Sequence, residues 1–544
     1  MPAARDRPGP GAPPLDRRPA APRRRRAAPG GPAVAVTRTG PLLAVLGAGL
    51  FLVAMDATVL HVALPDLVRQ LRPGAAAQVW IVAIYPLTAA PLLLPSGTLG
   101  DRFGRRRVLV TGYAVFGVAS LACALAPGVP ALLAARAALG AGGALIMPVT
   151  MSLLRELFPD RRKRRTAIAV CSGIAGTGSV FGPVLGGLLV EAWGWRATFL
   201  VNPPVILAAV VGALRWLPRS PPGQAPWDAL SAVLAAGGVL GIAFAAGPSG
   251  GGFIAGAAGC GLLVLFVHRQ RQAADPLLDP GLFRRPGVPG AVGGVLLVMS
   301  TLVGLGLLLA QYLQVVLGLS PTAAAARLLL VLGASAAGSV AAPALLERFG
   351  NARVRTAGFA MAAASLGIPA AGGLTSPWWL GGALVGSGLG MALALTSSTD
   401  TLLSAAPTDR AGGAAAVEKT GYELGAGLGT TAFGSLAAAV YAAHLTVPPG
   451  VPDAAKRLAS AGPAQAEAAS HGLAQAAELL AAARAACTVS VQASASVACG
   501  LFTLAALVSI IRRRIGRYTI RSGLSSTCPS CRRRRSSHPR LRPL

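Results

Sequence analysis

The sequence is poor in charged residues, above all in acidic ones. Only 12% of its 544 residues are charged and only 19 are Asp or Glu, whereas 53% are hydrophobic. Soluble domains carry about 25% charged residues, and their hydrophobic cores stop growing beyond about 250–300 residues. A soluble protein of this length and composition would expose more apolar surface than water tolerates. The composition therefore excludes an ordinary soluble fold and predicts an integral membrane protein.

The sequence also lacks motifs of common enzyme and metal sites. It contains no Walker A pattern GxxxxGK[ST] and no HExxH pattern, which argues against direct use of ATP and against a zinc protease site. Most of the seven Cys lie in or beside apolar runs, and the single CxxC formed by Cys528 and Cys531 is short of the four ligands of a structural zinc site. We therefore expect no metal, no cofactor and no enzyme activity.

Positive charge is abundant, but its distribution is that of a membrane protein rather than a nucleic-acid-binding one. The net charge is +30, with nine of the 49 Lys and Arg residues before Pro41 and eleven after Ile511. Most of the others fall in short clusters between apolar runs. Such clusters set the orientation of a chain in a membrane.

Apolar runs long enough to cross a bilayer recur along the chain. Crossing about 30 Å of hydrocarbon takes about 20 helical residues. Fourteen predicted spans meet this length approximately, at 41–63, 79–99, 107–126, 129–154, 166–190, 197–217, 228–247, 252–268, 290–313, 322–346, 354–373, 377–402, 420–444 and 487–511. With the N-terminus inside, six Lys and Arg fall in outside loops, two lie within spans and all the others are inside. This asymmetry favours an even number of spans and two cytoplasmic termini.

An internal repeat divides the spans into two halves. Residues 97–107 read GTLGDRFGRRR and residues 343–353 read PALLERFGNAR. Repeated six-helix halves are a transporter architecture. We predict a disordered basic N-terminal tail, a six-helix bundle, an inserted two-helix linker, a second six-helix bundle with a long outside loop (445–486), and a basic C-terminal tail. The corresponding boundaries are 1–40, 41–218, 219–289, 290–511 and 512–544.

Two ionisable residues deep in predicted spans are candidates for proton coupling. Asp56 lies in the middle of the first span and Arg136 lies in the fourth. Charged groups inside a membrane are costly and are functional candidates by default. Burial disfavours the charged form of Asp56 whereas a nearby Arg136 favours it, so the acid can bind and release protons as its access alternates. The alternative is a static buried pair that orients the two helices.

Two acids at the start of the thirteenth span are candidates for contact with substrate or with a second proton. Glu418 and Glu423 are five residues apart, so they do not share one helical face. Both are nevertheless placed to approach a cavity at the inner mouth. The alternative is a solvated helix start, where acids interact favourably with the helix dipole. A further acid, Asp400 near the inner end of the twelfth span, has no physical explanation at this level.

The segment 97–107 contains more than membrane orientation requires. The rule that basic residues stay inside explains its Arg cluster, but it explains neither the glycines nor the acid. We expect a gating loop in which charge pairs between helix ends form in one conformation and break in another. Its residues are Gly97, Asp101, Arg102, Gly104, Arg105, Arg106 and Arg107.

The fifth predicted span has one face of nearly bare backbone. Residues 176–187 read GTGSVFGPVLGG, in which small residues permit close helix contact and a proline opens the hydrogen-bond ladder. We expect tight, sliding contact with neighbouring helices, and the alternative is generic small-residue packing. The residues concerned are Gly178, Gly182, Pro183, Gly186 and Gly187.

These segments resemble the major facilitator superfamily, and within it the fourteen-span drug:proton antiporters. GTLGDRFGRRR resembles the superfamily loop between spans 2 and 3, and AMDATVLHVALPDL resembles the span 1 motif of the fourteen-span exporters. RAALGAGGA resembles the span 4 motif, GSVFGPVLGG the span 5 antiporter motif and WGWRATFLVNPP the start of span 6. The resemblance covers about residues 41–511.

The resemblance implies a two-bundle fold of fourteen helices in the plasma membrane, six plus two inserted plus six. It implies a proton-coupled efflux antiporter that exports small amphipathic molecules such as drugs, antibiotics, dyes or natural products by alternating access, driven by the proton gradient. By the same resemblance Asp56 and Arg136 carry proton coupling, and Asp101 and Arg102 gate. The expected partners are a small-molecule substrate, protons and the lipid bilayer, with no nucleic acid, and the expected state is a monomer.

Two positions depart from the family pattern, and three other functions remain open. The span 4 motif usually has Gln where this chain has Leu139. Some relatives carry two adjacent acids at the start of span 13, whereas the second position here is Lys419, which argues against dicationic substrates. The other functions are a proton-coupled metabolite importer of the same fold, a membrane-embedded enzyme using His61 and Asp66, and a non-transporting receptor or anchor.

Overall fold

The described part of the chain is helical throughout. A computed structural model describes residues 39–219, 228–246, 252–273, 281–374, 376–405, 411–470 and 474–526. The predicted N-terminal tail up to residue 38, parts of the linker and the end of the C-terminal tail lie outside the described residues, as do Cys528 and Cys531.

The first half of the chain folds into six helical spans. Their elements are α1 (Thr39–Leu71), α2 (Ala75–Phe103), α3 (Arg105–Ala124), α4 (Val129–Leu157), α5 (Arg161–Trp193) and the broken span α6 (Ala197–Leu200) with α7 (Asn202–Trp216). Two short helices follow, α8 (Ala229–Ala246) and α9 (Gly252–Gln272). They pack on each other, and α8 also packs against α2 and against α14 (Ala411–His444) of the second half, with the Trp80 and Phe244 ring centroids 6.0 Å apart.

The second half repeats the plan of six long helices and adds a helical segment. Its elements are η1 (Leu282–Arg284), α10 (Val288–Gln311) with the π-helical η2 (Tyr312–Val316), α11 (Pro321–Phe349), α12 (Asn351–Ala370), α13 (Pro377–Ala405), α14, α15 (Asp453–Ser460), α16 (Pro463–Ser470) and α17 (Ala476–Ser526). The predicted outside loop therefore contains α15, α16 and the first turns of α17. That last helix also continues past the predicted end of its span.

The internal repeat has the same backbone form in both halves. Gly104 separates α2 from α3 with φ of 93°, and Gly350 separates α11 from α12 with φ of 78°. Residues that carry a Cβ atom rarely adopt a positive φ. Glycine therefore allows one helix to end and the next to begin without a connecting loop. The repeat places the loop 97–107 and its counterpart at one end of the bundle, called here the predicted inner end.

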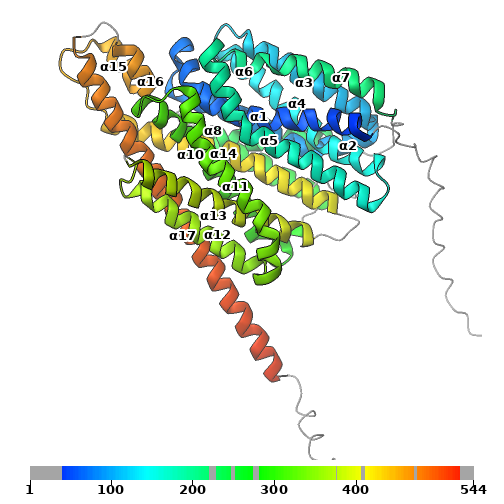
Figure 1. The fold of residues 1–544 in the computed structure, drawn as a ribbon. Coiled ribbons are helices and arrows are strands. Elements are labelled where there is room, and N and C mark those ends of the chain that lie inside the picture. The colour runs from blue at the N-terminus through cyan, green and yellow to red at the C-terminus, as the bar shows by residue number, and fades with distance from the viewer. Residues whose placement is uncertain are drawn as a thin grey trace, which may run out of the picture. The chain divides into compact units, whose positions relative to one another are not determined.

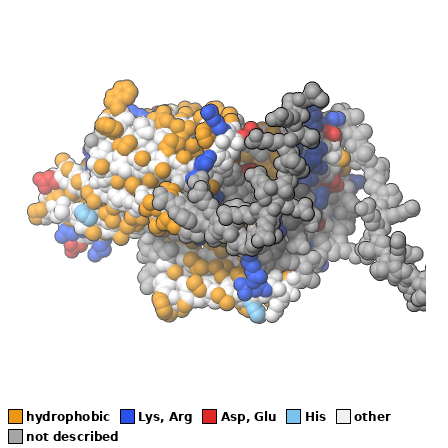
Figure 2. Space-filling view, turned by 90° about the horizontal axis from the view of Figure 1, so that it is seen from below, with side chains coloured by type: hydrophobic (Ala, Val, Ile, Leu, Met, Phe, Trp, Pro, Cys, Tyr) orange, Lys and Arg blue, Asp and Glu red, His pale blue; other side chains and the backbone are white. Residues whose placement is uncertain are grey.

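Twelve of the described helices are long and apolar enough to cross a membrane. The other two predicted spans are also helical, as α8 and α12, but α8 is short and α12 begins with two Arg residues in a less apolar stretch. Large hydrophobic side chains are exposed on the helices, among them Val118 at 70% and Phe253 at 90%. Hydrophobic side chains cover much of the coloured surface in Figure 2, as a lipid-facing protein requires.

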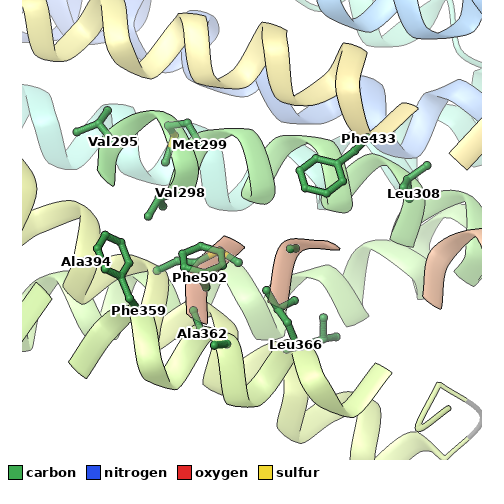
Figure 3. Packing of buried hydrophobic residues seen from close by; sticks show 14 of the residues in the cluster. Val295, Val298, Met299, Leu308, Phe359, Ala362, Leu366, Ala394, Phe433 and Phe502 are labelled. Carbon is green, nitrogen blue, oxygen red and sulfur yellow. The ribbon is translucent and has the colours of Figure 1, made fainter. Parts of the chain in front are cut away.

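Each half has its own packed interior, and the halves meet along two helix pairs. Figure 3 shows apolar side chains of α10, α12, α13, α14 and α17 meeting in the second half, where the Phe359 and Phe502 ring centroids are 5.9 Å apart. Between the halves, α2 packs on α14 and α5 packs on α11. In Figure 1 the colour runs from blue to bluish green through the helices of the first half and from green to red through those of the second.

The glycine-rich face of α5 lies directly against α1. A Cβ atom added at Gly178 would collide with the carbonyl group of Phe51, and one added at Gly186 would lie 2.6 Å from a methyl group of Val59. A Cβ atom at Gly187 would instead lie 2.9 Å from the backbone of Pro321 in α11. The bare face thus lets α5 contact α1 of its own half and α11 of the other half at backbone distance.

We predict that Gly178→Ala destabilises the protein by about 1–3 kcal/mol, because the backbone of Phe51 cannot move aside as a flexible side chain would. The measurement is thermal unfolding of the purified protein in detergent. Gly173→Ala on the same helix is the matched control, because nothing lies within 4 Å of a Cβ atom at that position. Equal melting temperatures for the two variants would contradict the tight α1–α5 contact.

Candidate functional site

A central cavity of about 310 Å³ lies between the two halves. Side chains from α1, α2, α4 and α5 line one side, and side chains from α10, α11 and α14 line the other. Its polar lining residues include Thr58, His61, Tyr85, Arg136, Lys419, Tyr422 and Glu423. The rest of the wall is largely Leu, Val, Ala, Pro and Gly, so a few polar groups project into an otherwise apolar space.

A buried ion pair joins the two deepest charged residues of the first half. Arg136 Nη1 donates to Asp56 Oδ2 at 2.8 Å, and the exposed fractions of the two side chains are 2% and 0%. Arg136 Nε donates to the carbonyl oxygen of Ile81 at 3.1 Å, and the guanidinium lies 5.2 Å from the Tyr85 ring centroid. Asp56 Oδ1 has no partner within the described residues. The arginine therefore faces the cavity while being held from three sides.

The two candidate acids of α14 have different surroundings. Glu418 accepts from Thr399 Oγ1 at 3.3 Å and pairs with Lys419 Nζ at 3.5 Å. Glu423 lines the cavity, is 8% exposed and has no ion-pair or hydrogen-bond partner in the part of the chain that the structure describes. The Lys419 ammonium group also lies 5.2 Å from the Tyr422 ring centroid. Of the two acids, Glu423 is therefore the one that lines the cavity without a direct ion-pair or hydrogen-bond partner among the described residues.

The central cavity continues toward the predicted inner end. A second cavity of about 530 Å³ has Gly97, Asp101 and Arg155 in its wall. The two cavities share four lining residues, Leu50, Met147, Ala175 and Lys419. Together they form a route from Arg136 to the predicted gating loop, with Lys419 at the junction.

The opposite, predicted outer end is closed by contacts between the halves. Gln314 Nε2 donates to the Val62 carbonyl oxygen at 3.1 Å, and Thr322 Oγ1 donates to Glu191 Oε2 at 2.6 Å. The α15–α16 segment adds two more hydrogen bonds, from Gln78 to Ala461 and from Gln465 to Pro73, at 3.1 and 2.7 Å. The described conformation is therefore open toward one end only.

The predicted gating loop contains a charge network centred on Arg105. Arg105 pairs with Asp101 at 3.0 Å and with Glu156 of α4 at 2.9 Å. Arg106 donates to the Leu214 carbonyl oxygen at 2.5 Å, whereas Arg102 lies over the Phe103 ring at 5.5 Å between guanidinium and centroid. The network joins α2, α3 and α4 within the first half. Glu156 was not identified from the sequence, because nothing in its local pattern marks it.

The structure also shows the surroundings of Asp400 and of the candidate pair His61 and Asp66. Asp400 accepts from Asn351 Nδ2 at 2.6 Å, which ties the inner end of α13 to the start of α12. Asp66 accepts from the Trp195 backbone N–H at 3.0 Å, and no hydrogen bond joins it to His61 within the described residues. His61 and Asp66 therefore do not form an assembled acid–base site in this structure.

Comparisons with known proteins place these features in context. The family model of the Major Facilitator Superfamily matches residues 46–430. The multidrug efflux pump LfrA of Mycolicibacterium smegmatis is 37% identical over 499 residues, covering 88% of this chain and 97% of the relative. The methyl viologen resistance protein SmvA of Salmonella typhimurium is 36% identical, covering 73% and 82%. The tetracenomycin C resistance and export protein of Streptomyces glaucescens is 34% identical, covering 74% and 76%.

One solved structure shows the same fold. A bacterial homolog of the human lysosomal transporter Spinster, in an inward-facing and unoccupied conformation, matches with a TM-score of 0.62 and 18% identity. The match covers 86% of this chain and 97% of that chain. At this identity the likeness concerns the fold alone.

We predict strong energetic coupling between Asp56 and Arg136. Arg136→Gln leaves a buried carboxylate without its cation, and breaking a buried pair in this way costs about 3–5 kcal/mol. The double variant Asp56→Asn/Arg136→Gln removes both charges, so it should be more stable than the sum of the single changes implies, by about 1–3 kcal/mol. Thermal unfolding of the four proteins measures this cycle, and additive single effects would contradict it.

Proposed function

Because the chain belongs to the major facilitator superfamily, we propose that it is a proton-coupled efflux antiporter that exports small amphipathic molecules by alternating access. The observation that carries this proposal is the buried Asp56–Arg136 pair, whose arginine lines a central cavity that continues to one end only. We assign fourteen spans to the chain, with α8 and α12 among them. Both termini are then cytoplasmic, the chain is a monomer in the plasma membrane, and the proton gradient is its energy source.

The pair supplies the chemistry that proton coupling needs. While Asp56 is ionised, its charge is balanced by Arg136 at 2.8 Å. When Asp56 takes up a proton, that balance is lost, and the guanidinium retains the Ile81 carbonyl oxygen and the Tyr85 ring as partners. Charge inside a low-dielectric cavity changes the relative stability of conformations that differ in solvent access. Protonation of Asp56 would therefore shift the balance between the inward-open and outward-open states.

The residues that line the cavity favour a cationic amphipathic substrate of low charge. Its apolar wall suits a hydrophobic body, and the Tyr85 and Tyr422 rings offer aromatic faces. Glu423 is the unpaired acid at the wall, whereas Glu418 is balanced by Lys419. The name of the relative LfrA, a multidrug efflux pump, supports the proposal of a cavity that accepts amphipathic molecules.

The two ends of the molecule suggest how access alternates. In the described conformation substrate reaches the cavity from the predicted inner end, as export requires. Opening the outer end requires the Gln314–Val62 and Thr322–Glu191 hydrogen bonds to break. At the inner end, we propose that Asp101, Arg105 and Glu156 hold α2, α3 and α4 in one arrangement, and that the bare face of α5 lets it move along α1 and α11.

We predict that cells producing the protein extrude ethidium, and that a protonophore abolishes this efflux. Asp56→Asn should reach the membrane in normal amount yet show only background efflux, because the amide cannot exchange a proton. Asp66→Asn is the control, since this acid lies outside the cavity and its acceptor oxygen is kept in the amide. Protonophore-sensitive efflux at the wild-type rate in Asp56→Asn would refute coupling through this residue, and ethidium accumulation in place of efflux would favour an importer.

We predict that Lys419→Glu raises the export of a dicationic dye relative to a monocationic one by about fivefold, equivalent to roughly 1 kcal/mol of added attraction. The change removes the cation that balances Glu418 and adds an acid where the two cavities join. The control Lys456→Glu makes the same change of charge on α15, at a residue that lines neither cavity. An equal response of the two variants, or no response in either, would place residue 419 off the substrate path.

A further inference from the structure

A third cavity, of about 580 Å³, lies on the second half away from the substrate route. It is bordered by α10, α12 and α17 at the predicted inner end, and it shares no lining residue with the two central cavities. Neither proton coupling nor substrate export, as derived above, uses this space. Its chemistry indicates what it holds.

Three arginines face this cavity without a balancing acid. Arg355 comes from the second turn of α12, and Arg512 and Arg513 come from α17. Neither Asp nor Glu is among the lining residues, and none of the three arginines has an ion-pair partner within the described part of the chain. Arg355 is half-buried, and its one described side-chain hydrogen bond goes to Thr401 Oγ1 at 3.4 Å. Positive charge gathered in this way favours an anionic occupant.

The rest of the wall is apolar and leaves room for a chain-like molecule. Gly290 and Gly293 of α10 form one side, and the space in front of Gly293 is open, with nothing within 4 Å of a Cβ atom. On α17, Leu504 and Val508 line the cavity with exposed fractions of 58% and 40%. A charged mouth at the predicted inner end thus leads onto an apolar groove that runs along the helices.

We propose that this cavity is a binding site for an anionic phospholipid of the inner leaflet. The phosphate group would lie among Arg355, Arg512 and Arg513, and an acyl chain would follow the groove between α10 and α17. Basic pockets between membrane helices on the cytoplasmic side bind acidic lipid head groups in this manner. Neither predicted tail of the chain suits this cavity, because both tails are strongly basic and the three arginines would repel them. A cationic substrate is disfavoured for the same reason.

The test is native mass spectrometry of the full chain, purified in detergent and delipidated, with equal amounts of dioleoylphosphatidylglycerol and dioleoylphosphatidylcholine added. The wild type should bind the anionic lipid in preference. The variant Arg355→Gln/Arg512→Gln should bind it about 25-fold more weakly, since each basic residue near a membrane surface contributes about fivefold. The control is Arg353→Gln, which removes an exposed arginine of α12 that does not line the cavity.

A second variant separates the groove from the charge. Gly293→Leu keeps all three arginines, fills the open space and should weaken binding of phosphatidylglycerol while leaving thermal stability unchanged. Glycerol phosphate at millimolar concentration should not displace the lipid, because it lacks the acyl chains. The proposal is overturned if Arg353→Gln and Arg355→Gln/Arg512→Gln weaken binding equally, if Gly293→Leu binds as the wild type does, or if glycerol phosphate displaces the lipid and so identifies a soluble-anion site.

Discussion

The buried ion pair between Asp56 and Arg136 is the interaction on which the rest of the structure depends. Charged side chains are among the most costly groups to bury inside a membrane protein. The pair is tolerated because the Ile81 carbonyl oxygen and the Tyr85 ring complete the surroundings of the guanidinium. The same low dielectric makes the pair sensitive to a single proton, because gain of that proton leaves one buried cation without its counterion. In the proposed mechanism, the same pair of residues is therefore both a stabilising contact and the proton switch.

Close helix packing connects this pair to the surface between the two halves. Glycines of α5 bring its backbone against α1, the helix that carries Asp56, while Gly187 on the same helix touches α11 of the other half. In the proposed mechanism, a change in the charge of Asp56 therefore acts through α5 on the surface between the halves. The outer end is closed by hydrogen bonds between the halves and by the buried Val62 side chain, which joins the apolar cluster of the second half.

Much of the fold could be predicted from the sequence, because hydropathy and charge report directly on spans and loops. Every predicted span is helical, Gly104 and Gly350 terminate helices at matching places, and the family resemblance is confirmed by the family model and by the relatives. The contact between Asp56 and Arg136 also followed from their depth. The partner of Arg105 in α4, Glu156, and the placement of Lys419 where the two cavities join did not follow. Both depend on how each helix is rotated about its axis, which tertiary packing decides.

The measurement that tests the central claim most directly is dye-driven proton flux in proteoliposomes. Lumenal pH is followed with a trapped indicator while an ethidium gradient is imposed on purified wild-type protein and on Asp56→Asn, with ethidium binding to both proteins measured separately. If the pair couples transport to protons, ethidium moves protons in the opposite direction through the wild type. The variant should bind ethidium and move no protons. Ethidium-dependent proton flux through Asp56→Asn at the wild-type rate would contradict the assignment.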